Sequence, residues 1–167
     1  MSAPVRNAAK GGVLKADEFA KVLPAGVPLM GLDVGSKTIG LALSDVTRTI
    51  ASGLLTLTRG KFAADTQRLL MLVDEHNVGG LVIGLPVNLD GSEGPRAQAT
   101  RAFARNLAKL TPHPILLWDE RLTTAAAKRS LLEADVSRRR RAQVIDKVAA
   151  TLILQSALDR LNLFARA

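Results

Sequence analysis

The sequence predicts an α/β domain in which helices cover both faces of a mixed five-stranded sheet. Two features of its 167 residues point to this class. The first third shows the period-two alternation of strands, whereas the remainder alternates segments of helical periodicity with short, continuous apolar runs. Three meandering strands followed by strand–helix crossovers make the first three strands antiparallel and the later ones parallel.

The first three elements are expected to be strands joined by turns. Gly35 and Ser36 form the turn after the first strand, and residues 45–53 form the turn after the second. The first strand therefore ends at an acidic residue, Asp33, next to a glycine turn. The three predicted strands span residues 29–33, 39–44 and 55–58.

The later elements alternate between helices and buried strands. Phe62, Leu69 and Val73 recur at helical spacing, and a pair of glycines follows them, as at a helix C-terminus. Continuous apolar runs are typical of parallel strands that are covered on both faces. The predicted order is a helix over 61–77, a strand over 81–85, a helix from the loop 88–95 to residue 110, a strand over 115–118, and helices over 125–132 and 137–161.

The length and composition indicate one domain, which we assign to residues 28–167. Residues 1–27 mix acidic and basic side chains without an apolar core, so we expect a loosely ordered tail and no secretory signal. The chain has no cysteine, which excludes disulfides and thiolate metal sites. No apolar run approaches the roughly 20 residues that cross a bilayer. We therefore expect a cytoplasmic protein with no membrane partner.

The charge balance favours nucleic acid as the partner. Lys and Arg number 23 against 15 Asp and Glu, which gives a net charge of +8. Such an excess attracts an anionic polymer, although it can also serve solubility alone. Aromatic residues, on which unpaired bases stack, make up only 3% of the chain. Contacts to the nucleic-acid backbone are therefore expected more than contacts to bases.

Three acidic residues lie where buried elements end or turn inward. Asp33 ends the first strand, Glu120 follows a later one, and Asp146 lies on an apolar face of the last helix. Carboxylates in apolar surroundings need an ion pair, hydrogen bonds or a metal. Mg²⁺ and similar ions prefer carboxylate oxygens, and two such ions can hold the attacking and leaving oxygens of a phosphodiester. These residues are candidate ligands of Mg²⁺ or Mn²⁺ in a nuclease.

Each acid also has a purely structural interpretation. Asp33 can be an ordinary turn former. Either Asp119 or Glu120 could be the ligand, because alternation directs only one of them to the site, and Asp119 can simply pair with Arg121. Asp146 can pair with a basic residue of the preceding helix.

Basic residues accompany each of the three acids. A lysine follows the glycine turn after Asp33, an arginine follows Glu120, and four consecutive arginines precede Asp146. Such side chains can contact phosphates, although the arginine run can also be a solvated loop. The candidate nucleic-acid-binding residues are Lys37, Arg121, Arg138, Arg139, Arg140 and Arg141.

Four motifs resemble those of the YqgF/RuvX family of pre-16S ribosomal RNA nucleases and Holliday junction resolvase-like proteins. The motifs are GLDVGSKTIGLALSD (31–45), VIGLPVNLDGSEGPRA (82–97), DERLTT (119–124) and VIDKVAATLILQSALD (144–159). They span nearly the whole chain except the tail, and DERLTT is the most distinctive. The resemblance implies a ribonuclease H-like fold. It also implies that Asp33, Glu120 and Asp146 are the catalytic, metal-binding acids.

The function implied by the resemblance is metal-dependent hydrolysis of phosphodiester bonds in the maturation of the 5′ end of pre-16S rRNA. A first alternative is a resolvase of branched DNA, which needs two active sites and hence a dimer. Unlike resolvases, the strand over 81–85 ends without a glutamate, so the second acid has to be Glu120. A second alternative is a non-catalytic nucleic-acid-binding module of ribosome assembly or transcription. The sequence leaves monomer and homodimer both open.

Overall fold

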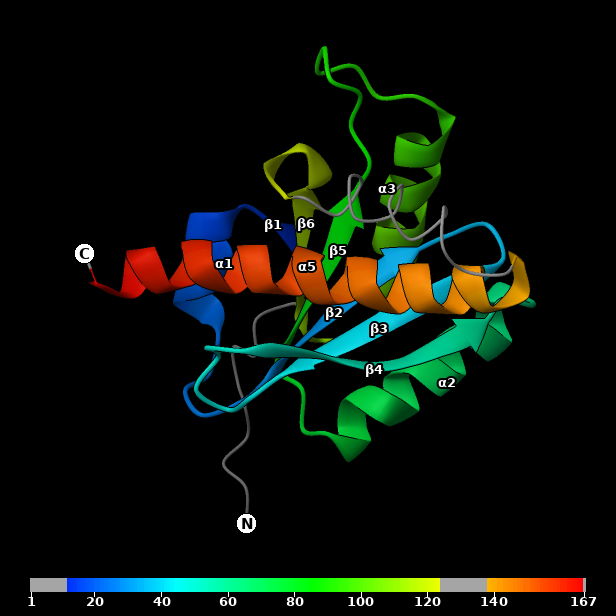
Figure 1. Ribbon diagram of the computed structural model, residues 1–167. Helices are drawn as coiled ribbons and strands as arrows, with labels where there is room; N and C mark the ends of the chain where they lie inside the picture. Colours follow the sequence, from blue (N-terminus) through cyan, green and yellow to red (C-terminus); the bar gives the residue numbers. More distant parts are fainter. Residues whose placement is uncertain (1–11, 124–137, 167) are drawn as a thin grey trace.

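Six strands form one mixed sheet (Figure 1). The computed structural model of the protein describes residues 12–123 and 138–166, with the backbone alone for residues 138–146 and 166. The strands are β1 (Gly12–Leu14), β2 (Leu29–Val34), β3 (Thr38–Ser44), β4 (Ala51–Thr58), β5 (Gly80–Leu85) and β6 (Pro114–Asp119). Their order across the sheet is β1-β6-β5-β2-β3-β4. β2, β3 and β4 are antiparallel neighbours, whereas β1, β6, β5 and β2 run parallel.

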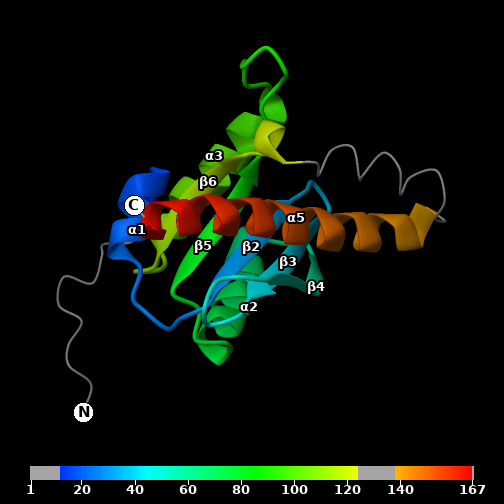
Figure 2. The same cartoon turned by 60° about the vertical axis from the view of Figure 1, so that its left-hand side comes forward.

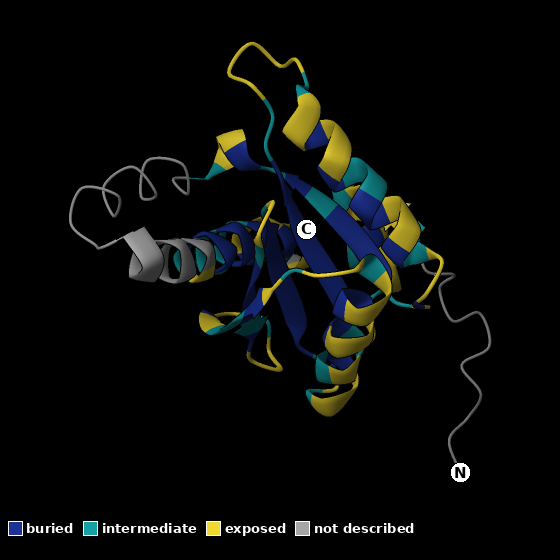
Figure 3. Cartoon of the chain, turned by 90° about the vertical axis from the view of Figure 1, so that its right-hand side faces the viewer, coloured by how far each residue is buried: buried dark blue, intermediate teal, exposed yellow. Residues whose placement is uncertain are grey.

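Two helices cover each face of the sheet in the described part of the chain. They are α1 (Ala16–Val22), α2 (Phe62–Glu75), α3 (Pro95–Ala108) and α5 (Arg138–Arg166). α1 and α5 pack on one face, and α2 and α3 pack on the other. Figure 3 shows the buried sheet between these two layers. α5 crosses β2, β3 and β4, and its C-terminal part lies beside α1 (Figure 2).

The predicted α/β class is confirmed, with antiparallel strands first, parallel strands after and helices on both faces. The sheet has six strands rather than five, because Gly12–Leu14 pairs in parallel with the start of β6. Three residues are too few to show a strand period, which is why the sequence does not reveal β1. α1 follows, and its Phe19 is fully buried. The stretch expected to be a loose tail therefore contains a strand and a helix, whereas the domain boundaries stay a prediction.

The turn between β3 and β4 is shorter than the predicted residues 45–53, because β4 already begins at Ala51. The register of the pair shifts between Leu41 and Ala42 of β3, which leaves one extra residue in β4. Such a bulge interrupts the alternation of side chains. Period-two alternation in the sequence consequently does not reveal the first residues of this strand.

The other predicted elements correspond to helices and strands of the structure with shifts of a few residues at their ends. The exception is the predicted helix over residues 125–132, which lies outside the described residues. In the ranges that the structure describes, no helix combines the length and the apolar character needed to cross a membrane.

β2 lies between two apolar cores, and this placement positions the site. Leu29 packs in the core under α5, whereas Met30, Leu32 and Val34 pack in the core under α2 and α3. Successive strand residues point to opposite faces, and both faces are covered here, so all six residues of β2 are buried. Asp33 falls in the α5-facing set, where it is the one acidic residue of the strand.

Candidate active site

Asp33 lies at the end of β2, and only 3% of its surface is exposed. Gly31, two residues earlier on the same face, lies so close to α5 that an added Cβ atom would be 2.7 Å from Cβ of Leu154. After Asp33 the chain reverses in a tight turn, in which the Gly35 N–H donates to the Thr38 carbonyl at 2.8 Å. A Cβ atom on Gly35 would be 3.0 Å from that oxygen. The glycine therefore permits the close approach at which the strand ends, one residue after Asp33.

Gly84 of β5 occupies the position beside Asp33. Continuing the parallel register of β2 and β5 by one residue places these two side by side, and Gly84 pairs in turn with Trp118 of β6. A Cβ atom on Gly84 would be 2.4 Å from Cδ1 of Ile153, so this position faces α5. On the face toward α5, three neighbouring strands therefore present the carboxylate of Asp33, no side chain at Gly84, and the indole ring of Trp118.

Glu120 brings its carboxylate over Gly84 from the other side. It begins a 3₁₀ turn, η1 (Glu120–Leu122), directly after β6. Its Oε2 atom lies 3.1 Å from the Cβ position of Gly84, and 9% of the residue is exposed. Its carbonyl oxygen accepts hydrogen bonds from the N–H of Thr123 at 3.1 Å and from its hydroxyl at 3.2 Å. Asp33 and Glu120 thus flank Gly84 on one face of the sheet, at the carboxyl ends of parallel strands.

Asp119 does not share this face but forms an ion pair with Arg121. Nη2 of Arg121 lies 2.7 Å from Oδ2 of Asp119, and the Arg121 N–H also donates to Asp119 Oδ1 at 2.9 Å. Hydrogen bonding to the guanidinium holds the pKa of Asp119 below its usual value and raises the pKa of Arg121. The two interpretations of DERLTT therefore apply to different residues: Asp119 makes the structural pair, and Glu120 enters the candidate site.

Asp146 belongs to α5, one helical turn before Ala150, whose carbonyl oxygen lies 3.0 Å from the Cβ position of Gly31. Its side chain lies outside the described part of the structure, so the predicted convergence of all three acids stays a prediction. Among the side chains that are described, no three acidic or histidine groups gather as a metal site would require. Asp33 and Glu120 are the two candidate ligands that the described structure places on either side of Gly84.

The predicted nucleic-acid-binding residues occupy three places. Lys37 is exposed on the turn between β2 and β3. Arg121 is 37% exposed although its guanidinium is paired with Asp119. The backbone of residues 138–141 forms the first turn of α5, and the side chains of this arginine run lie outside the described residues.

The sequence did not point to Gly84 or to two arginines, Arg59 and Arg96, as residues near the site. Gly84 interrupts the apolar run over residues 81–85, and this interruption was the available signal. Arg59 and Arg96 donate to the carbonyls of Gly35 and Val34, at the turn that follows Asp33. No local spacing announces these contacts, because the partners are far apart in the chain.

Comparison with known proteins places these residues in a wider context. A sequence model of the family described as RuvX, Holliday junction resolvase, matches residues 27–160. A Rhodobacter capsulatus protein named "Putative pre-16S rRNA nuclease" is 60% identical over 151 residues, which cover 90% of this chain and 95% of the relative. A Paracoccus denitrificans protein of the same name is 60% identical over 150 residues, again covering 90% and 95%.

Solved structures share the fold at low sequence identity. RuvC of T. thermophilus in complex with a Holliday junction substrate superposes with a TM-score of 0.52 at 13% identity, covering 81% of this chain and 96% of that one. The yeast mitochondrial Holliday junction resolvase superposes with a TM-score of 0.51 at 10% identity, covering 90% and 86%. The fold is therefore ribonuclease H-like, as the sequence motifs imply.

Proposed function

The chain belongs to the RuvX family, and from this premise we propose that it is a divalent-metal-dependent nuclease whose site is built on Asp33 and Glu120. The supporting observation is that two buried carboxylates flank Gly84, a position without a side chain, at the carboxyl ends of parallel strands. Sheets of this type build their sites at that end. Net charge of +8 favours an anionic polymer as the substrate.

The chemistry of the donor set fits Mg²⁺ or Mn²⁺. Hard cations take carboxylate oxygens, and two carboxylates over a glycine floor supply them without a thiolate or a histidine. Asp33 and Glu120 would hold the cation, and Asp146 is the predicted third ligand. A bound cation supplies polarisation of the phosphodiester and activation of water. Asp33 and Glu120 in turn keep their carboxylates on one face of the sheet, because their backbones are fixed by the tight turn after β2 and by η1.

The basic residues serve the substrate backbone in this proposal. Lys37 and Arg121 lie on the turns that directly follow the two acids, and the run 138–141 begins the helix that carries Asp146. These side chains contact phosphates rather than base edges, so they position the nucleic-acid strand over Asp33 and Glu120 without selecting a sequence.

We propose precursor 16S rRNA as the substrate, with cleavage at its 5′ end during ribosome biogenesis in the cytoplasm. Relatives that are 60% identical over 90% of the chain carry the name "Putative pre-16S rRNA nuclease". A four-way DNA junction is the second candidate, because the family model bears the description of a Holliday junction resolvase. Resolution requires two cuts and hence a symmetric dimer, whereas trimming of an RNA end does not.

The test is cleavage by the purified protein of a precursor 16S rRNA fragment and of a four-way DNA junction. Each reaction is run with Mg²⁺, with Mn²⁺ and with EDTA, and Asp33→Asn is run in parallel. Cation-dependent cutting of the RNA that the variant lacks supports the proposal. Paired cuts in the junction alone would favour the resolvase. Tight binding of RNA without cleavage under all conditions would favour a non-catalytic module.

A further inference from the structure

A second basic site, separate from the predicted nucleic-acid-binding residues, is formed by Arg59 and Arg96 around the turn that follows Asp33. It lies on the face of the sheet opposite to the one that Asp33 faces. It is a cavity of about 210 Å³ between β2, the link after β4 and the start of α3. Arg59 and Arg96 line it from two different elements, together with Gly35 and Ser36 of the turn. Val34 also contributes to its wall and, by strand alternation, faces away from the side on which Asp33 lies.

The two guanidinium groups hold the turn through its backbone. Arg59 Nη1 donates to the carbonyl of Gly35 at 2.6 Å, and Arg96 Nη2 donates to the carbonyl of Val34 at 3.2 Å. These are the two carbonyls directly after Asp33 in the chain. The Arg59 N–H also donates to the Lys37 carbonyl at 2.8 Å. Within the described residues each guanidinium uses one N–H group on the turn, which leaves its other N–H donors for another partner.

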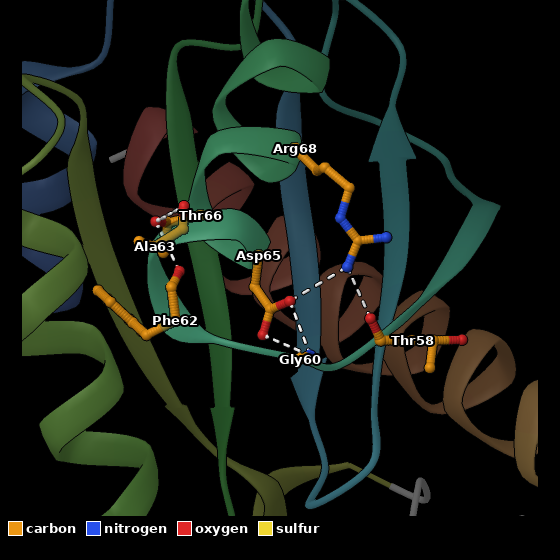
Figure 4. Close-up of polar contacts among 7 residues, drawn as sticks. All are labelled: Thr58, Gly60, Phe62, Ala63, Asp65, Thr66 and Arg68. Atoms are coloured by element: carbon orange, nitrogen blue, oxygen red, sulfur yellow. Dashed lines mark hydrogen bonds and ion pairs between the residues drawn. The ribbon is translucent and has the colours of Figure 1, made fainter.

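The residues directly before and after Arg59 in the chain, Thr58 and Gly60, are held by hydrogen bonds with Arg68 and Asp65 (Figure 4). Asp65, which is 1% exposed, accepts from the Gly60 N–H at 2.9 Å. Arg68 bridges Asp65 and the carbonyl of Thr58, at 3.1 Å and 2.6 Å. A buried carboxylate is therefore used to immobilise the residues before and after Arg59.

The Arg59 side chain is also supported from below. Its guanidinium carbon lies 5.6 Å from the centroid of the Phe103 ring, and Phe62 packs edge-on against the same ring. A cation over an aromatic face is stabilised by the ring without losing its charge. Within the described residues, neither Arg59 nor Arg96 forms an ion pair with a carboxylate, in contrast to Arg68, Arg101 and Arg121. The site therefore keeps two pre-positioned positive charges.

We propose that this cavity binds a phosphate of the nucleic-acid backbone at a nucleotide other than the one being cut. The inference rests on the proposed function, because it assumes that the substrate is a polynucleotide crossing the turn at residues 34–37. Guanidinium groups match phosphate oxygens in geometry and charge. Since the same two side chains donate to the turn after Asp33, the contact would fix the substrate and the acid relative to one another.

The test is binding of a labelled structured RNA in EDTA, measured over a range of salt concentrations. Arg59→Gln and Arg96→Gln are compared with Arg105→Gln, which makes the same charge change on an exposed site of α3. Arg105 lies nine positions after Arg96, about half a turn away around the helix. For Arg96→Gln, the slope of the logarithm of the binding constant against the logarithm of salt concentration should be smaller in magnitude than for wild type by roughly 0.7 to 0.9, the value for one neutralised phosphate. The slope for the Arg105→Gln control should not change. Equal slopes for wild type, Arg96→Gln and the control would overturn the inference.

Two further measurements separate phosphate binding from a purely structural role. Arg96→Lys should recover most of the salt dependence that Arg96→Gln loses, because lysine restores the positive charge although it lacks the planar guanidinium. If Arg96→Lys behaves as Arg96→Gln does, the residue only supports the turn. A neutral methylphosphonate moved along the RNA should weaken wild-type binding most at one position. Arg96→Gln should lose that position's effect and no other. An identical methylphosphonate profile in the two proteins would contradict the site.

The outcome can be told apart from a failure of the proposed nuclease function. Suppose that Arg96→Gln removes the effect of one methylphosphonate position on RNA binding, but the protein never cleaves with Mg²⁺ or Mn²⁺. The nuclease proposal then fails and the phosphate site stands. If the protein cleaves RNA but wild type and Arg96→Gln give the same methylphosphonate profile, only the phosphate site is wrong.

Discussion

The carboxylate of Glu120 lies directly over Gly84, with Oε2 3.1 Å from the point where a Cβ atom of that residue would be. Gly84 is part of β5, Glu120 directly follows the neighbouring parallel strand β6, and Asp33 lies on the other side of Gly84, in β2. The missing side chain is therefore a structural requirement of the site. It leaves space between the two acids that any other residue would fill.

Replacing Gly84 with alanine should damage both packing and activity. The added methyl group would lie 2.4 Å from Ile153 Cδ1 and 3.1 Å from Glu120 Oε2, so both neighbours have to move. Overpacking of a well-filled core costs about 1–3 kcal/mol, which urea unfolding would measure as a loss of free energy of unfolding. Cleavage of the RNA fragment should fall as well, because Glu120 is displaced.

A double variant separates these two effects. Ile153→Val removes the Cδ1 atom, so Gly84→Ala combined with Ile153→Val should regain part of the stability that the single alanine loses. It should not regain cleavage, since the contact with Glu120 remains. If cleavage returns together with stability, the position of Glu120 is not what Gly84 protects.

Asp33→Asn should abolish cleavage while it leaves RNA binding intact or tighter. Asparagine has nearly the same volume but lacks the charge that a cation requires, and one negative charge near the phosphates disappears. A drop in cleavage of about 10²-fold or more is expected for the loss of a positioned catalytic group. Asp74→Asn on the exposed side of α2 is the matched control and should cleave as wild type does. Undiminished cleavage by Asp33→Asn would place the chemistry elsewhere.

The sequence predicts the location of Asp33 well, because a fully covered strand appears as a continuous apolar run and the acid ends it. The choice between Asp119 and Glu120 is different. Alternation says only that they point apart; which one faces α5 depends on the phase of β6. Trp118 sets this phase by packing in the core under α5, and Glu120, two residues later, returns to the same face.

The second basic site could not be predicted from spacing. The contact from Arg59 to Gly35 joins residues 24 positions apart, and that from Arg96 to Val34 joins residues 62 positions apart. Arg59 reaches the turn because Thr58, at the end of β4, pairs with Thr38 of β3, whereas Arg96 reaches it from the first turn of α3. Both contacts are properties of the assembled fold. The short β1 is invisible for a related reason: only its pairing with β6 makes it a strand.

The turn between β3 and β4 should make stability depend on pH. Hydrogen bonds to Asp45 from the Thr47 hydroxyl and from the N–H groups of Ile50 and Thr49 lower its pKa from 3.8 to about 2. A carboxyl group with a lowered pKa in the folded state stabilises the fold fully above the unfolded pKa of about 4, and this contribution is lost as pH falls through about 2. The difference in unfolding free energy between wild type and Asp45→Asn should therefore shrink between these two pH values. A constant difference across this range would contradict the assignment.

The arginine run at residues 138–141 should act as a clamp on the nucleic-acid backbone that does not read sequence. Each contact of Lys or Arg with a phosphate releases counterions, which adds roughly 0.7 to 0.9 to the salt slope. Replacing all four arginines with serine should therefore weaken binding to every RNA alike and flatten its salt dependence. Two unrelated RNAs of equal length and shape, titrated with salt, provide the measurement. Coinciding slopes for wild type and variant would mean that the run is a solvated segment, and weakening of only one RNA would mean that it reads sequence. Because the run and Arg96 are on different elements, their effects on the slope should add if both contact phosphates.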